Sequence, residues 1–186
     1  AAEMGDKADI LINTAEYVRP GSVMDRHGVT LARDEMETNY FGLMRLIQAF
    51  GPGMRARGAD GDNSACAWVN LLSVYALSNW PVYGTTSASQ AAALSLSQCL
   101  RGDFAGSVVK VINVLFGPLE ESWRQPLPPR MVTPQRLADT VIHALQQGIE
   151  NVTLGPVAED VVKRYKENPF VLERELTQLQ MGGAAV

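Results

Sequence analysis

Residues 83–93 read Tyr-Gly-Thr-Thr-Ser-Ala-Ser-Gln-Ala-Ala-Ala, and they open the most informative segment of the chain. Small residues continue from here, and the pattern predicts one long helix over Thr85–Arg101. No charged side chain occurs between Thr85 and Leu100. A helix that faces solvent usually carries charged residues on its outer face, and this one has none. The core of the protein can cover only one face of the helix. We therefore expect a protein–protein interface on the remaining face.

The segments on either side alternate between strand and helix patterns. The expected strands are short apolar runs, as in parallel sheets that are buried on both faces. They cover Ile10–Asn13, Cys66–Leu72, Val108–Leu115 and Val152–Leu154. A helical period runs over Asp34–Arg57 with Pro52 inside it, so we expect a kink or a break near Gly51. This alternation predicts an α/β fold.

The last third of the chain has clear helix boundaries. Thr133 is a predicted N-cap before Pro134 at the first helical position, and Gly148 is predicted to end that helix. The helices expected after it cover Pro156–Lys166 and Pro169–Gln180. Residues 181–186 are expected to form a disordered tail. No repeat or linker interrupts the sequence, so we expect a single domain over residues 1–186.

Several motifs resemble those of the short-chain dehydrogenases/reductases. Ser87-Ala88-Ser89 and the small-residue helix after it resemble the family's Tyr-Ser-Ala-Ser-Lys-Ala-Ala run. Asn39 matches the helical Asn that holds a proton-relay water in active members. Ser73 lies 13 residues before position 86, which is the family's Ser-to-Tyr spacing. Two further segments are similar to the family strand that ends in Asn-Asn-Ala-Gly and to the loop after its sixth strand, namely Asp9–Glu16 and Val114–Glu120.

The resemblance implies a Rossmann-like doubly wound parallel sheet. In the family, this sheet begins with a strand and a Gly-rich turn that holds the dinucleotide pyrophosphate. Only eight residues precede Asp9, and no Gly-x-x-x-Gly-x-Gly or Gly-x-Gly-x-x-Gly occurs later. We therefore expect a partial fold that lacks the first three strands and binds no cofactor itself. Either the sequence is part of a longer chain, or the protein dispenses with the nucleotide-binding half.

The resemblance also implies that the catalytic pair has been replaced. Thr86 stands where the family has its catalytic Tyr, and Gln90 stands where it has the Lys. An aliphatic hydroxyl has no accessible pKa for acid–base work, and Gln carries no charge that could lower one. Tyr83 lies too early to replace the Tyr, and no Lys occurs between residues 8 and 109. We therefore expect no functional catalytic residue at the family positions Asn39, Ser73, Thr86 and Gln90.

Each matching residue also has a structural interpretation, which we favour. Ser73 would satisfy backbone groups at a strand end. Asn39 would hydrogen-bond the backbone of a neighbouring strand. Glu121 falls where the family has a Thr that contacts the nicotinamide carboxamide. Glu120 and Glu121 are both expected to be exposed carboxylates in a loop.

The composition narrows the function classes. A net charge of −4 argues against a nucleic-acid or anionic-membrane surface. No apolar run reaches the ~20 residues of a membrane span. His27 and His143 have no metal-ligand spacing around them, so we expect no metal site. Cys66 and Cys99 are expected to be free thiols, and no signal peptide opens the sequence, which favours a cytoplasmic location.

Three functions remain open. The first is a non-catalytic subunit of a heteromeric dehydrogenase, similar to the silent subunit of 2-(hydroxybenzyl)succinyl-CoA dehydrogenase. Its partner would be a catalytically complete homologue that oxidises a hydroxyacyl substrate, such as an acyl-CoA, with NAD. In the family's geometry the contact would involve Thr85–Arg101 and Asp34–Arg57. The second is an active NAD(P)-dependent oxidoreductase whose N-terminal half lies outside this sequence. The third is a small-ligand binding module with a cleft near Ser73, Tyr83 and Trp123.

Overall fold

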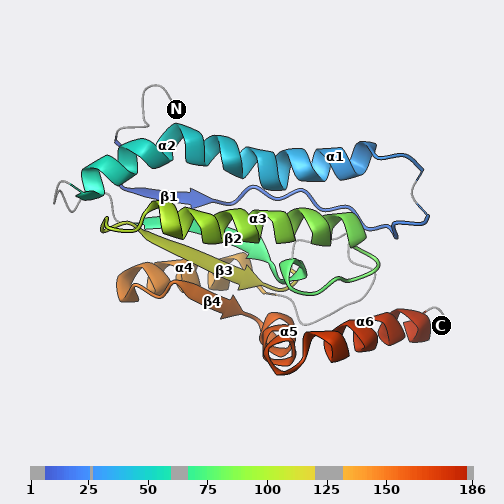
Figure 1. Ribbon diagram of the computed structural model, residues 1–186. Coiled ribbons are helices and arrows are strands. Elements are labelled where there is room, and N and C mark those ends of the chain that lie inside the picture. Colours follow the sequence, from blue (N-terminus) through green and yellow to red (C-terminus); the bar gives the residue numbers. More distant parts are fainter. Residues whose placement is uncertain (1–6, 26, 60–66, 120–131, 184–186) are drawn as a thin grey trace.

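A computed structural model describes residues 7–25, 27–59, 67–119 and 132–183 of the chain (Figure 1). Four parallel strands form one sheet in the order β1-β2-β3-β4. They are β1 (Ile10–Asn13), β2 (Ala67–Ser73), β3 (Lys110–Phe116) and β4 (Asn151–Leu154). Parallel neighbours need crossover connections, which here contain the helices. The predicted α/β fold with a Rossmann-like parallel sheet is therefore confirmed.

The strand bounds differ little from the predicted ones. β1 matches, whereas β2 ends one residue later than predicted and so includes Ser73. β3 begins at Lys110 instead of Val108, and β4 begins one residue early, at Asn151. These shifts are within the usual uncertainty of element ends.

The helical segment after β1 differs from the single helix predicted over Asp34–Arg57. It consists of α1 (Thr30–Met36), one π-helical turn η1 (Glu37–Phe41) and α2 (Gly42–Ala59). A kink or a break was expected near Gly51. The break is wrong, because α2 continues through Pro52 without interruption, and the kink stays a prediction. Gly51, Met54 and Gly58 are buried on the inner side of α2. Pro52 has no backbone N–H and so removes one hydrogen bond from the helix. The packing of these buried residues offsets that loss.

The remaining helices follow the predicted order. They are the 3₁₀ turn η2 (Val74–Ala76), α3 (Gly84–Asp103), α4 (Pro134–Gln147), α5 (Pro156–Glu167) and α6 (Pro169–Gly183). The predicted caps of α4 are present: the Thr133 side chain accepts a hydrogen bond from the Arg136 amide, and Gly148 has a positive φ of 64°. The expected tail over residues 181–186 is partly wrong, because α6 continues to Gly183. Residues 184–186 lie outside the described part.

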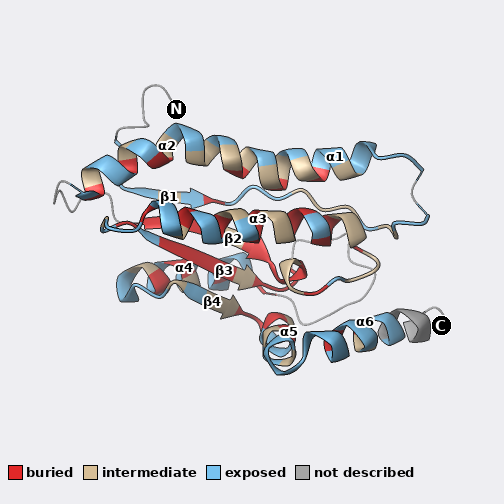
Figure 2. Cartoon of the chain, viewed as in Figure 1, coloured by how far each residue is buried: buried red, intermediate tan, exposed pale blue. Residues whose placement is uncertain are grey.

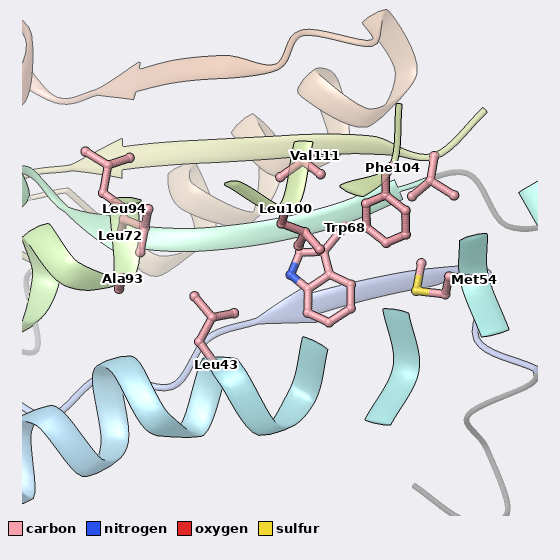
Figure 3. Packing of buried hydrophobic residues seen from close by; sticks show 10 residues of the cluster. Leu43, Met54, Trp68, Leu72, Ala93, Leu94, Leu100, Phe104 and Val111 are labelled. Atoms are coloured by element: carbon pink, nitrogen blue, oxygen red, sulfur yellow. The ribbon is translucent and has the colours of Figure 1, made fainter. Parts of the chain in front are cut away.

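The helices cover both faces of the sheet, and the core has a layer on each side (Figures 1 and 2). On one side, α2 and α3 pack over Trp68 and Leu72 of β2, as Figure 3 shows. On the other side, α4 places Leu137 and Val141 against β2, β3 and β4. A third cluster joins η2 and Tyr83, the residue before α3, to α5 and α6. No helix in the described ranges is long and apolar enough to cross a membrane.

A row of asparagines crosses the whole sheet at one register. The paired positions are Asn13, Asn70, Asn113 and Asn151. Asn70 Nδ2 donates to Ser97 Oγ at 2.7 Å, and Ser97 Oγ donates to Asn113 Oδ1 at 2.6 Å. One turn further along α3, Arg101 donates to Asn151 Oδ1 at 2.8 Å. These bonds fix α3 along the strands.

The outer edge of β1 leads to a testable prediction. Among the described residues β1 pairs only with β2, and Ile10 and Ile12 are 44% and 45% exposed. Native proteins usually cover or protect such edges, so we still expect a further segment or a partner chain on β1. The backbone amides of Ile10–Asn13 that point away from β2 should then exchange hydrogen at least ~10-fold more slowly when that segment or partner is present than in this chain alone. Equal exchange rates in the two samples would contradict this expectation.

Candidate functional site

The positions that resemble a dehydrogenase site gather at the carboxyl end of the sheet. Ser73 ends β2, residues 14–19 follow β1, and the first turns of α3 lie beside them. In open parallel sheets, ligands bind outside this end of the strands. The geometry here shows what each side chain can offer to a ligand.

Asn39 lies in η1, and hydrogen bonds to the protein occupy its side-chain amide. Its Oδ1 accepts from the Tyr17 amide at 2.8 Å, and its Nδ2 donates to the Tyr17 carbonyl at 2.9 Å. Nδ2 also donates to Ser89 Oγ at 2.9 Å. Asn39 therefore joins η1 to the segment after β1 and to α3. The π-helical turn, which sequence patterns do not reveal, places it on this side of the helix.

Thr86 is fully buried and hydrogen-bonded to a buried carboxylate. Its Oγ1 donates to Glu35 Oε1 of α1 at 2.6 Å, and the Arg19 amide donates to the same oxygen at 3.1 Å. The hydroxyl at the family's Tyr position thus has a structural partner and no exposed surface. Sequence analysis missed Glu35. Its spacing of four residues from Asn39 could have indicated it, because that spacing puts both on one helical face.

Gln90 also binds protein groups with both polar atoms of its side chain. Its Oε1 accepts from the Ser73 amide at 3.1 Å, and its Nε2 donates to Glu16 Oε1 at 3.3 Å. Ser73 Oγ accepts from the Tyr75 amide at 3.3 Å. Ser73 therefore satisfies a backbone group at the end of its strand, as its structural interpretation expected.

Glu16 is the second acidic residue that sequence analysis passed over as a functional candidate. Its side chain is exposed, yet protein surrounds the carboxylate closely enough that desolvation raises its pKa to about 7. Solvent that reaches the side chain screens part of this effect. The carboxyl group is thus protonated at a higher pH than an ordinary glutamate, and its bond to Gln90 fixes its position.

Aromatic rings pack beside this group. Tyr75 and Tyr83 stack with ring centroids 4.8 Å apart, and Trp80 packs edge-on to Tyr75 at 5.7 Å. Burial raises the pKa of the Tyr75 phenol above its usual range, and the charges of Tyr83 and Glu16 add to the rise. Burial also raises the pKa of Tyr83. Both phenols therefore stay protonated at neutral pH. Tyr83 is the buried residue directly before α3, so it lies outside the helix that carries Thr86 and Gln90.

Other candidate residues are more easily placed. His27 and His143 are exposed, and within the described ranges no group of three metal-binding side chains comes together. Cys99 is exposed on α3 with a free thiol. The residues Cys66, Glu120, Glu121 and Trp123 lie outside the described part of the chain.

Comparisons with known proteins agree with the motifs. The family model described as short chain dehydrogenase matches residues 1–130. Dehydrogenase/reductase SDR family member 7B of Danio rerio is 36% identical over 107 residues, which are 56% of this chain and 32% of that protein. The match thus spans about a third of that relative's length.

Two solved structures illustrate the structural likeness. A short chain dehydrogenase from Burkholderia cenocepacia in complex with NADP is 31% identical, with a TM-score of 0.83 over 94% of this chain and 71% of its own. A short-chain dehydrogenase from Streptomyces avermitilis shares the fold at 21% identity, with a TM-score of 0.75 over 98% of this chain and 75% of its own.

The contact between Thr86 and Glu35 predicts a loss of stability when it is removed. Thr86→Val leaves the buried carboxylate without this donor, and such losses cost about 1–3 kcal/mol. Thr177→Val, at an exposed position of α6 where the hydroxyl also donates a hydrogen bond, should change stability by less than about 0.5 kcal/mol. Urea unfolding of both variants measures the difference. Equal stabilities for the two variants would show that the contact contributes nothing.

The raised pKa of Glu16 predicts a pH-dependent stability. The unfolded carboxyl loses its proton near its ordinary value of 4.5, while the folded one keeps it to about 7, so stability falls as pH rises between these values. Glu16→Gln removes this dependence and should raise Tm more at about pH 8 than at about pH 5. Exposed Glu159→Gln is the control. If the difference in Tm between Glu16→Gln and the unchanged chain did not vary with pH, the raised pKa of Glu16 would be contradicted.

Proposed function

Because the chain belongs to the short-chain dehydrogenase family, we propose that it is a subunit that performs no hydride transfer itself and supports a catalytically complete homologue. One observation carries this proposal: the groups at the family's Tyr and Lys positions are both engaged inside the protein. Thr86 donates to Glu35, and Gln90 binds Ser73 and Glu16. Both side chains are thus already held by hydrogen bonds inside the protein.

The chemistry of these two positions supports a silent site. General acid–base catalysis contributes roughly 10²–10⁴-fold to a rate, and it needs a group that can exchange a proton near neutral pH. The Thr86 hydroxyl is fully buried and cannot ionise in that range. A Tyr at position 86 would also have to place its ring at a position that is fully buried.

The same residues do not fit the nicotinamide end of a dinucleotide. The family's Lys offers an ammonium group, whereas Gln90 offers an uncharged amide whose oxygen and nitrogen already have protein partners. Glu16 adds a carboxylate next to this amide. We therefore include in the proposal that this chain binds no NAD itself and that NAD and a hydroxyacyl substrate bind to the partner subunit.

A surface for that partner is present on α2 and α3. Between Thr85 and Leu100, the exposed residues of α3 are all uncharged, namely Ala88, Ser95, Gln98 and Cys99. Next to it, a groove of about 550 Å³ opens between α2 and the end of α3, over Gly51, Pro52 and Phe104. Small residues permit close approach of another helix. This supports pairing through Thr85–Arg101 and Asp34–Arg57, the contact that the family resemblance predicts.

A second candidate function is an NAD(P)-dependent oxidoreductase of which this chain is one part. The observation that favours it is the 31% identity to the NADP-bound Burkholderia protein over 94% of this chain. In that case position 86 would need a substitute acid. Binding of NADP(H) by the purified chain, followed by fluorescence of the reduced nicotinamide, would favour this candidate over the silent subunit.

Co-expression with an intact Tyr-x-x-x-Lys homologue tests the proposed subunit role. The two chains should co-purify, and Cys99 should react with iodoacetamide at least ~10-fold more slowly in the complex, because its face becomes covered. Ala92→Glu and Ser95→Arg should each dissociate the complex in light scattering. The matched control is Gln146→Arg, at an exposed position of α4, which should leave the mass unchanged. A complex that survives both α3 variants would contradict the proposed interface, and no association at all would contradict the role.

A further inference from the structure

The segment that carries Glu16 is held on both sides. Before it, Asn13 Oδ1 accepts from the Ala15 amide at 3.3 Å, which turns the chain at the end of β1. After it, Asn39 binds both backbone groups of Tyr17. The backbone of Glu16 is therefore fixed by neighbours on either side, so its side chain starts from a defined position at the carboxyl end of the sheet.

One buried amide positions two different functional groups. Gln90 is only 2% exposed, and its two polar atoms point to Ser73 on one side and to Glu16 on the other. Gln90 thereby sets the spacing between the Ser73 end of β2 and the Glu16 carboxylate. The second oxygen of that carboxylate has no hydrogen-bond partner among the described residues, and the side chain is exposed.

Ser73 provides a donor at the carboxyl end of β2. Its Oγ accepts from the Tyr75 amide, so its own hydrogen remains available for a ligand oxygen. The titratable groups that act on this site from neighbouring elements are Tyr75 of η2 and Tyr83 before α3, and both phenols stay neutral at neutral pH. Arg19, three residues further on, directs its guanidinium over the Tyr17 ring.

We propose that Glu16 is a general base for proton transfer at the carbon next to a carbonyl group, acting on small β-dicarbonyl or β-ketoacyl compounds at the carboxyl ends of β1 and β2. Glu16 takes the proton as the C–H bond breaks, and the electron pair moves to the carbonyl oxygen, which accepts a hydrogen bond from Ser73. The enolate then regains a proton at carbon. No electrons leave the substrate, so the step needs no dinucleotide.

The titration of Glu16 supports this role. A general base works best when its pKa lies near the working pH, and the pKa of Glu16 is raised to about 7. The deprotonated fraction, and with it the rate, should rise through about pH 7 and level off about one pH unit above it. This activity is independent of the proposed subunit role, because it concerns the carboxyl ends of β1 and β2 and not the α2–α3 face.

The experiment follows deuterium incorporation into acetylacetone in D₂O by proton NMR. The purified chain should accelerate exchange at the central carbon in proportion to its concentration, with saturation at high acetylacetone and a rise in rate towards about neutral pH. Glu16→Gln should reduce exchange to the buffer rate, and Ser73→Ala should reduce it on the order of 10-fold. Exposed Glu159→Gln is the matched control and should exchange like the unchanged chain.

A second variant separates chemistry from folding. Glu16→Asp keeps the charge but withdraws the carboxylate from the reach of Gln90, so exchange should fall at least ~10-fold while the circular dichroism spectrum stays the same. The proposal is overturned if the unchanged chain gives no exchange above buffer between about pH 6 and about pH 8, or if Glu16→Gln exchanges as fast as the unchanged chain. Neither result would bear on partner binding through α3.

Discussion

The hydrogen bonds of Ser97 between Asn70 and Asn113 are the constraint on which the other contacts depend. These groups are fully buried at the boundary between α3 and the sheet, where a polar group without a partner is costly. A slip of α3 by one turn would break both bonds. Gln90 lies two turns earlier on the same helix, about 10 Å away, so the Ser97 bonds also fix where its amide meets the ends of β1 and β2.

A working active site and a stable structure place opposite demands on such positions. Catalytic groups must keep hydrogen-bonding capacity for the substrate, which leaves them poorly satisfied in the empty protein. Here Glu35 and Glu16 supply partners for Thr86 and Gln90, and α1 and the segment after β1 are thereby attached to α3. Thr86 and Gln90 thus form, with the two acidic residues, one set of contacts along the first turns of α3.

How well each feature of the fold and of the candidate site can be predicted depends on how far apart in sequence the interacting residues lie. Strands and the caps of α4 follow from local patterns, because apolar runs and Thr-Pro or Gly at helix ends act within a few residues. The family motifs placed Asn39, Ser73 and positions 86 and 90 in one region. The π-helical turn, the passage of α2 through Pro52 and the bonds of the two glutamates could not be predicted, because they arise from contacts between segments far apart in sequence.

The all-parallel sheet has a consequence for the folding kinetics. Every strand pair in it joins distant parts of the chain: Ile10 lies beside Ala67, and Asn113 lies beside Asn151. Loop closure must precede each pairing, so the helices, which need only local contacts, can form long before the sheet is complete. Until β2 and β3 are covered, their apolar side chains remain open to other chains. A nascent chain of this kind is therefore most vulnerable to aggregation in the interval between helix formation and sheet closure.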